Sequence, residues 1–215
     1  MENSDQSTVT DPVRYDTLIL GLGNVLWADE GFGVRAVEAL NARFRFGPGV
    51  HVMDGGTQGI FLLPWVCSAE RLLILDAVDF GMEPASLRLV RGDDVPCFMG
   101  AKKVSMHQAG FQEVLASADL TESLPSELAL VGVQPEVLND YGGSLTSGVR
   151  GRIDEAVELA CAVLAELEHE LANFRSMMEY VNRIPDDISL ANIEARGETF
   201  PLNGVLGGDH IYTMD

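Results

Sequence analysis

Cysteine is scarce in this chain, and no hydrophobic run is long enough to cross a bilayer. The three cysteines, Cys67, Cys97 and Cys161, are widely spaced and form no CxxC pair, so neither a disulfide framework nor a thiolate zinc site is indicated. No apolar run approaches the roughly 20 residues that a membrane-spanning helix requires. The first residues also lack the basic and then apolar pattern of a signal peptide. We therefore expect a cytoplasmic protein whose cysteines are buried or incidental thiols.

Basic residues are also few. The 14 Lys and Arg residues face 33 Asp and Glu residues, which leaves a formal net charge of −19. This balance opposes binding to nucleic acid and insertion into an anionic membrane. A chain of 215 residues that is 47% hydrophobic can bury a substantial core and most often forms one domain. We predict a flexible leader over residues 1–14, a single domain over 15–183, and a flexible tail over 184–215.

Two common catalytic or binding motifs are absent. The stretch GLGNVLWADEGFG (residues 21–33) begins like a nucleotide-binding turn, but Leu26 stands where GxGxxG requires a third glycine. Glu30 would also repel a phosphate at the helix N-terminus. The chain has no GxSxG elbow, and Ser105 lies only two residues from His107, which is weak evidence for a catalytic triad. A nucleotide site and a serine or cysteine nucleophile are therefore disfavoured.

Strand and helix patterns alternate along the chain and predict an α/β fold. A mainly parallel sheet covered on both faces follows from this alternation. The connection after residue 79 is too short for a parallel crossover, so the next strand should run antiparallel. A loop is expected over 93–105. The predicted strands are 16–22, 50–54, 71–79, 86–92 and 127–133, and the predicted helices are 31–44, 107–118 and 145–174.

Polar residues follow the predicted parallel strands where each strand ends. In an open α/β sheet, ligands bind outside the carboxyl ends of the strands. The loop over 93–105 can span about 40 Å when extended, so it can return His107 to the same end. The polar residues expected there are Asp29, Glu30, Asp54, Asp76, Asp79 and Gln134.

Crowded carboxylates repel one another unless a cation lies among them, and two carboxylates with an imidazole suit a divalent first-row metal. Three protein ligands also leave positions open for a substrate atom. The candidate metal ligands are Glu30, Asp76 and His107. On spacing alone, an equal alternative is that Glu30 and His107 cap helices and Asp76 merely ends a strand. His51, which opens a strand, is predicted to be structural or solvated.

Five motifs together resemble one enzyme family. They are LGLGNVLWADEGFGVRAVEAL, VMDGGTQG, LLILDAVDFG, SMHQAGFQEVL and GVQPEVLNDYGGSLTSGV, in this order over roughly residues 15–175. This combination resembles the hydrogenase maturation endopeptidases, which process the large subunit of nickel–iron hydrogenases. Five concordant motifs are far more specific than a single glycine pattern. The resemblance implies a three-layer α/β/α sandwich around a twisted, mainly parallel sheet with one antiparallel strand.

The resemblance also implies roles for individual residues. The family's metal-contacting positions correspond to Glu30, Asp76 and His107, the same three that the strand ends select. Asp54 opens the DGGTxG loop, which is implicated in activity or substrate recognition. Asp54 could orient a water molecule or the scissile amide as a candidate catalytic residue, or it could be a turn-forming aspartate that hydrogen-bonds its own loop. Asp29 is expected to support the turn instead of binding metal.

The activity implied is removal of a short C-terminal extension from the hydrogenase large-subunit precursor after nickel insertion. We hypothesise that the nickel is supplied by the precursor and is not held permanently, which would make cleavage conditional on correct loading. Two alternatives stay open. One is a self-sufficient metallopeptidase or amidohydrolase with its own zinc, and the other is a non-catalytic chaperone that senses nickel in the precursor. We expect a monomer.

Overall fold

The computed structural model of the protein describes residues 14–101 and 106–182. The chain divides into two compact units, one that ends at Ala160 and one that begins at Cys161. The predicted tail and all but the last residue of the predicted leader lie outside the described residues. The single-domain boundaries at 15 and 183 therefore stay a prediction.

The first unit is built on a five-stranded sheet with the order β2-β1-β3-β5-β4. Neighbouring strands run parallel except β4, which is antiparallel to β5. The short connection before β4 explains this reversal, and the predicted antiparallel strand is confirmed. We call the end of the sheet at which the four parallel strands finish its carboxyl end. The strands are β1 (Tyr15–Leu22), β2 (Val50–Gly56), β3 (Ala69–Ala77), β4 (Leu87–Arg91) and β5 (Glu127–Val133).

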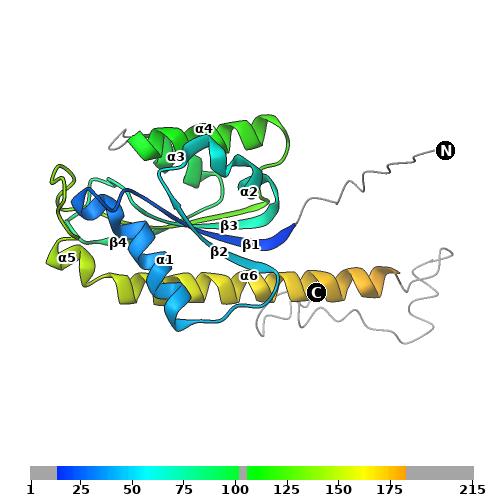
Figure 1. The fold of residues 1–215 in the computed structure, drawn as a ribbon. Helices are drawn as coiled ribbons and strands as arrows, with labels where there is room; N and C mark the ends of the chain where they lie inside the picture. Colours follow the sequence, from blue (N-terminus) through cyan, green and yellow to red (C-terminus); the bar gives the residue numbers. More distant parts are fainter. Residues whose placement is uncertain (1–13, 102–105, 183–215) are drawn as a thin grey trace, which may run out of the picture. The chain divides into compact units, whose positions relative to one another are not determined.

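Helices cover both faces of this sheet, which confirms the predicted α/β/α layering (Figure 1). Helix α1 contacts β1, β2 and β3 on one face. On the other face, α2 contacts β3, α3 contacts β4 and β5, and α4 packs against α2 and α3. The helical segments are the 3-10 turns η1 (Ala28–Gly31) and η2 (Gly59–Leu62), and the α-helices α1 (Phe32–Arg43), α2 (Leu63–Cys67), α3 (Asp94–Ala101), α4 (Met106–Leu120), α5 (Ser147–Arg150) and α6 (Ile153–Asn182).

The prediction of a loop over 93–105 is wrong for most of that segment, because α3 occupies Asp94–Ala101. Val95 and Met99 lie one helical turn apart and are both buried in the core. Pro96 falls in the first turn, where its missing N–H is tolerated. The spacing of these two apolar residues is therefore that of a helix, which the predicted loop did not include.

The predicted long helix over 145–174 is also corrected. The structure has a short α5 that ends at Arg150, and then α6, which begins at Ile153 and continues to Asn182. Gly151, the C-cap of α5, interrupts the helix because glycine is a poor helix former. The N-cap of α5 is Thr146, whose hydroxyl oxygen accepts a hydrogen bond from the Val149 amide at 3.4 Å.

The core between the sheet and α4 shows which side chains of the strands face α4. Because side chains alternate along a strand, every second residue of β1 and β3 points to this face. The core residues there include Leu18, Leu20, Leu22, Leu72 and Ile74 from the strands and Phe111, Val114 and Leu115 from α4.

On the other face, α1 lies directly against the strand ends. A Cβ atom added to Gly33 would lie 2.0 Å from the Leu75 carbonyl oxygen and 2.3 Å from that of Leu22. Only glycine allows this close approach. The start of α1 is thereby fixed at the carboxyl end of the sheet.

Candidate functional site

The turn after β1 positions Glu30. Gly23 has a φ of +133°, and a Cβ atom there would lie 1.8 Å from the Glu30 carbonyl oxygen. That oxygen accepts a hydrogen bond from the Asn24 amide at 3.2 Å, and the Glu30 amide donates to the Trp27 carbonyl at 2.9 Å. The backbone of Glu30 is therefore held on both sides. Its side chain is half-buried at the carboxyl end of the sheet.

Asp29, the neighbour of Glu30, is fully buried, and its carboxylate stabilises the local fold through hydrogen bonds. Its carboxylate accepts hydrogen bonds from the amides of Glu136 and Val137, both at 2.9 Å, and from the Thr146 amide at 2.7 Å. The Thr146 hydroxyl donates to it at 3.2 Å. Asp29 thus joins the turn to the segment that follows β5, as the sequence predicted for a residue that supports the turn.

Asp76 lies at the carboxyl end of β3 and is fully buried. One of its carboxylate oxygens accepts a hydrogen bond from the Ala77 amide at 2.7 Å. Asp76 lies two residues beyond Ile74, which belongs to the core under α4. Strand alternation therefore directs the Asp76 side chain towards the face that α4 covers.

Asp54 lies at the same end of the sheet on the edge strand β2, paired in register with Gly21. Its side chain is exposed. Met53 packs against the core under α4. Because side chains alternate along a strand, the side chain of Asp54 leaves the sheet on the face opposite to that of Asp76. The strands β2 and β3 flank β1, which places their backbones roughly 10 Å apart. Asp54 and Asp76 therefore share an end of the sheet but not a face.

His107 lies in the first turn of α4, and its side chain is outside those that the structure describes. Helix α4 begins at the carboxyl end of the sheet (Figure 1). Three residues after His107, a Cβ atom on Gly110 would lie 3.3 Å from the Cα of Gly59. The HQAG and DGGTQG segments are therefore direct neighbours.

The GLG turn and the DGG loop are joined as well, because the Gly23 amide donates to the Gly56 carbonyl at 3.1 Å. Three sequence motifs thus meet at one end of the sheet. Among the described side chains, no group of three His, Cys, Asp or Glu residues is placed to hold a metal ion. The His107 side chain is not among the described ones, so the set Glu30, Asp76 and His107 stays a prediction.

Two other acidic or amide side chains predicted for this end hold a loop. The Gln134 amide oxygen accepts hydrogen bonds from the amides of Phe80 at 2.8 Å and Met82 at 3.2 Å. Its NH₂ group donates to the Asp79 carboxylate at 3.0 Å, which also accepts from the Gly81 amide at 2.9 Å. Asp79 and Gln134 lie where the sequence predicted, but their polar atoms bind the β3–β4 connection.

Two of the three cysteines, Cys67 and Cys161, are not activated as nucleophiles. Burial raises the pKa of the Cys67 thiol, an effect that a hydrogen bond with Thr121 partly opposes, and burial also raises the pKa of Cys161. Both thiols are therefore protonated near neutral pH, and the protonated form is the unreactive one. The exposed Cys97 thiol donates to the Asp93 carbonyl at 3.5 Å.

His51 lies at the other end of the sheet, near the start of β2. Its ring stacks on Tyr15 with centroids 4.8 Å apart and on Trp65 with centroids 5.2 Å apart. Of the two roles predicted for His51, structural or solvated, this stacking supports the structural one.

Exposed apolar side chains at the carboxyl end were not predicted. Within the described residues, seven of the nine large exposed hydrophobic side chains follow the ends of parallel strands. The sequence analysis predicted only polar residues for this end of the sheet, although the apolar residues also follow the predicted strand ends in the sequence. We call this group the apolar ring, and it consists of Val25, Leu26, Ile60, Phe61, Met82, Val137 and Tyr141.

Comparisons with known proteins identify the family. The family model described as hydrogenase maturation protease matches residues 34–163, which are 130 of the 215 residues. The hydrogenase expression/formation protein HupM of Azotobacter chroococcum mcd 1 is 59% identical over 149 residues, covering 69% of this chain and 71% of that protein. HupD of Bradyrhizobium diazoefficiens is 49% identical over 180 residues, covering 83% and 94%. The hydrogenase 2 maturation protease of Escherichia coli K12 is 40% identical over 150 residues, covering 69% and 90%.

Solved structures agree with these sequence relatives. The hydrogenase maturating endopeptidase HybD from E. coli superposes with a TM-score of 0.66 at 38% identity, covering 70% of this chain and 92% of that one. The [NiFe] hydrogenase maturation protease HybD from Thermococcus kodakarensis gives a TM-score of 0.54 at 26% identity, covering 68% and 97%. Family model, sequence relatives and fold point the same way: the chain belongs to the hydrogenase maturation protease family and is a peptide-bond hydrolase.

Proposed function

We propose that this protein removes the C-terminal extension from the nickel-loaded large-subunit precursor of a nickel–iron hydrogenase. The observation that carries the proposal is the meeting of three motifs at the carboxyl end of the sheet. Glu30 leaves a fixed turn, Asp76 ends the central strand, and the helix turn that contains His107 packs beside the DGGTQG loop. Carboxylate and imidazole groups together suit a divalent first-row metal such as nickel.

In this proposal the nickel arrives with the precursor as part of the substrate. Three ligands from the protease would leave the remaining positions to groups of the precursor. Glu30 and Asp76 are held by backbone contacts, so little reorganisation is needed when the metal is engaged. The protease would thereby cleave only a precursor that already contains its metal.

Peptide hydrolysis requires water to add to the scissile carbonyl carbon and a proton to reach the departing nitrogen. The metal would polarise the carbonyl or activate the water. Asp54 is our candidate for the residue that orients or deprotonates that water. It is exposed on an edge strand, so an extended peptide can reach it from solvent.

The apolar ring supports a macromolecular substrate. Apolar side chains gathered on one part of a surface commonly mark a protein interaction site. Trp27 and Tyr141 stabilise part of this region through an edge contact with centroids 5.3 Å apart, and the Gly142 amide donates to the Leu26 carbonyl at 2.7 Å. A folded precursor could therefore dock over the carboxyl end of the sheet while its C-terminal segment enters the site.

The test is incubation of the purified protein with nickel-loaded and nickel-free large-subunit precursor from its own organism, followed by mass measurement. We expect the loaded precursor alone to lose its extension. Glu30→Gln and His107→Ala should lower the rate by at least about 1,000-fold, because a metal contact contributes several kcal/mol. Glu70→Gln, an exposed glutamate at the start of β3, is the matched control.

Efficient cleavage of the nickel-free precursor would overturn nickel dependence. Stoichiometric zinc in the resting protein would favour a self-sufficient metallopeptidase, and recovery of the released C-terminal peptide would exclude a non-catalytic chaperone. The proposal places the reaction in the cytoplasm and assigns it to a monomer. Over residues 14–101 and 106–182, no helix has the length and apolar character needed to cross a membrane.

A further inference from the structure

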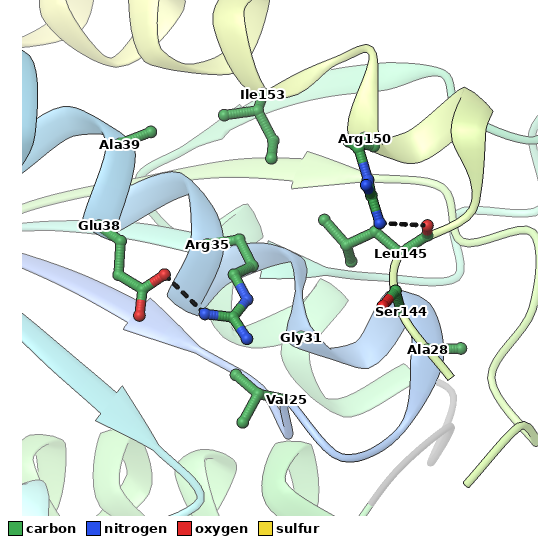
Figure 2. Close-up of a pocket in the computed structure, with 10 residues that line it drawn as sticks. All are labelled: Val25, Ala28, Gly31, Arg35, Glu38, Ala39, Ser144, Leu145, Arg150 and Ile153. Carbon is green, nitrogen blue, oxygen red and sulfur yellow. Dashed lines mark hydrogen bonds and ion pairs between the residues drawn. The ribbon is translucent and has the colours of Figure 1, made fainter. Parts of the chain in front are cut away.

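A pocket of about 570 Å³ opens between the turn that precedes α1 and the segment around α5. Figure 2 shows Arg35 extending into it from α1 and Arg150 from α5. Val25, Leu145 and Ile153 supply apolar wall. The pocket therefore combines two guanidinium groups with apolar surface.

The pocket lies beside the proposed site. Ala28 and Gly31, which also line it, flank Asp29 and Glu30 in η1. Val25 belongs both to the pocket wall and to the apolar ring. A chain segment bound here would run next to the turn that carries Glu30.

The charge of the pocket is opposite to that of the protein. Arg35 pairs with Glu38 at 2.8 Å, and both side chains are about half exposed. Arg150 donates to the Leu145 carbonyl at 3.4 Å, and no carboxylate within the described part of the chain pairs with it. Two cations and one anion thus line this pocket, in a chain whose net charge is −19.

Each guanidinium has five N–H donors, and the contacts above use few of them. Among the groups that a peptide carries, a carboxylate fits such donors, because it can accept two parallel hydrogen bonds from one guanidinium. An acidic protein repels acidic peptides elsewhere on its surface, so a local pair of arginines would make binding selective.

We propose that this pocket binds a carboxylate-bearing part of the precursor's C-terminal extension, with an apolar side chain of the extension against Val25, Leu145 and Ile153. The inference rests on the proposed function and adds a substrate-recognition site to it. The carboxylate is either the C-terminal carboxylate of the precursor or the side chain of an aspartate or glutamate. Arg35 and Arg150 bind it directly, while Glu38 competes with it for Arg35.

The first experiment measures the Kd of a fluorescent synthetic peptide with the sequence of the extension, and the KM and kcat for nickel-loaded precursor. Arg35→Gln and Arg150→Gln should each raise Kd and KM about tenfold, the effect of losing a hydrogen bond to a charged group, with kcat nearly unchanged. Glu38→Gln should lower both constants. A merely structural role for these residues cannot produce opposite signs.

Matched controls lie on or directly beside the same helices. Arg43 on α1 pairs with Asp154, and Arg152, just after α5, pairs with Glu155, and neither arginine lines the pocket. Arg43→Gln and Arg152→Gln should change Kd by less than about twofold, as expected for exposed ion pairs. Melting temperatures of all variants would show that each one is folded.

Two peptide variants distinguish the source of the carboxylate. If amidation of the peptide's C-terminus weakens binding, the terminal carboxylate occupies the pocket. If Asp→Asn or Glu→Gln within the peptide weakens binding, the carboxylate of that side chain occupies the pocket.

Unchanged Kd and KM in both arginine variants, with normal cleavage by the wild type, would overturn the pocket proposal and leave the proposed function intact. Absence of cleavage by the wild type would instead overturn the proposed function. Binding of this chain's own 199–215 peptide in place of the extension would overturn the pocket proposal in favour of self-occupancy.

Discussion

Two aspartates lie at the carboxyl end of the sheet, Asp29 in the turn after β1 and Asp54 near the end of β2, yet their surroundings are opposite. Asp29 is fully buried, and its carboxylate accepts four hydrogen bonds. Asp54 is exposed, and a hydrogen bond within its loop is made by its backbone carbonyl, which accepts from the Gln58 side chain at 3.4 Å. Asp29 therefore stabilises the structure around the site, whereas the carboxylate of Asp54 is available for chemistry.

The physical reason is desolvation. A buried carboxylate is tolerated only when hydrogen bonds replace its water, and at Asp29 those bonds come from three residues of the segment after β5. Asp54 keeps its hydration because β2 is an edge strand. Substitution should therefore affect stability at the first position and activity at the second.

The largest effect is expected for Asp29→Ala. The change removes a buried carboxylate and leaves three backbone amides without an acceptor, which should lower the free energy of unfolding by about 3–5 kcal/mol. Urea denaturation measures this loss. Asp54→Ala is the matched control and should change stability by less than about 0.5 kcal/mol. Equal losses at the two positions would contradict the comparison.

A smaller effect, on rate alone, is expected for Asp54→Asn. If Asp54 orients or deprotonates water, kcat for the nickel-loaded precursor should fall about 100-fold, and urea denaturation should show unchanged stability. The alternative from the sequence, a turn-forming aspartate, predicts the reverse: lost stability with little change in kcat. Mass measurement of processed precursor over time decides between them.

The smallest effect is expected for Thr146→Ala. Its hydroxyl both accepts from the Val149 amide and donates to Asp29, so the loss should be about 1 kcal/mol of stability. Thr146→Ser keeps both bonds and should behave as wild type. Unchanged stability in Thr146→Ala would show that the backbone amide of Thr146 alone sustains the contact with Asp29.

Much of the fold was predictable because its signals are local. Apolar runs indicated each strand, and the length of one connection indicated that β4 reverses. Helix α3 was predicted as a loop, and its buried face is marked by Val95 and Met99, whose burial depends on tertiary packing. The interruption at Gly151 was missed because the apolar stripe continues on both sides of it.

By itself, the sequence determined the order of the strands along the chain, the acidic character of the strand ends, and the candidate ligands Glu30, Asp76 and His107. Only the tertiary structure decided that Asp29 supports the turn while Asp54 is exposed, that Asp54 and Asp76 start on opposite faces, and that two arginines share a pocket. The reason is that these features depend on contacts between residues far apart in the sequence. The contact between Asp29 and Thr146 joins residues 117 positions apart, and burial at that distance depends on how the chain packs, not on any local pattern.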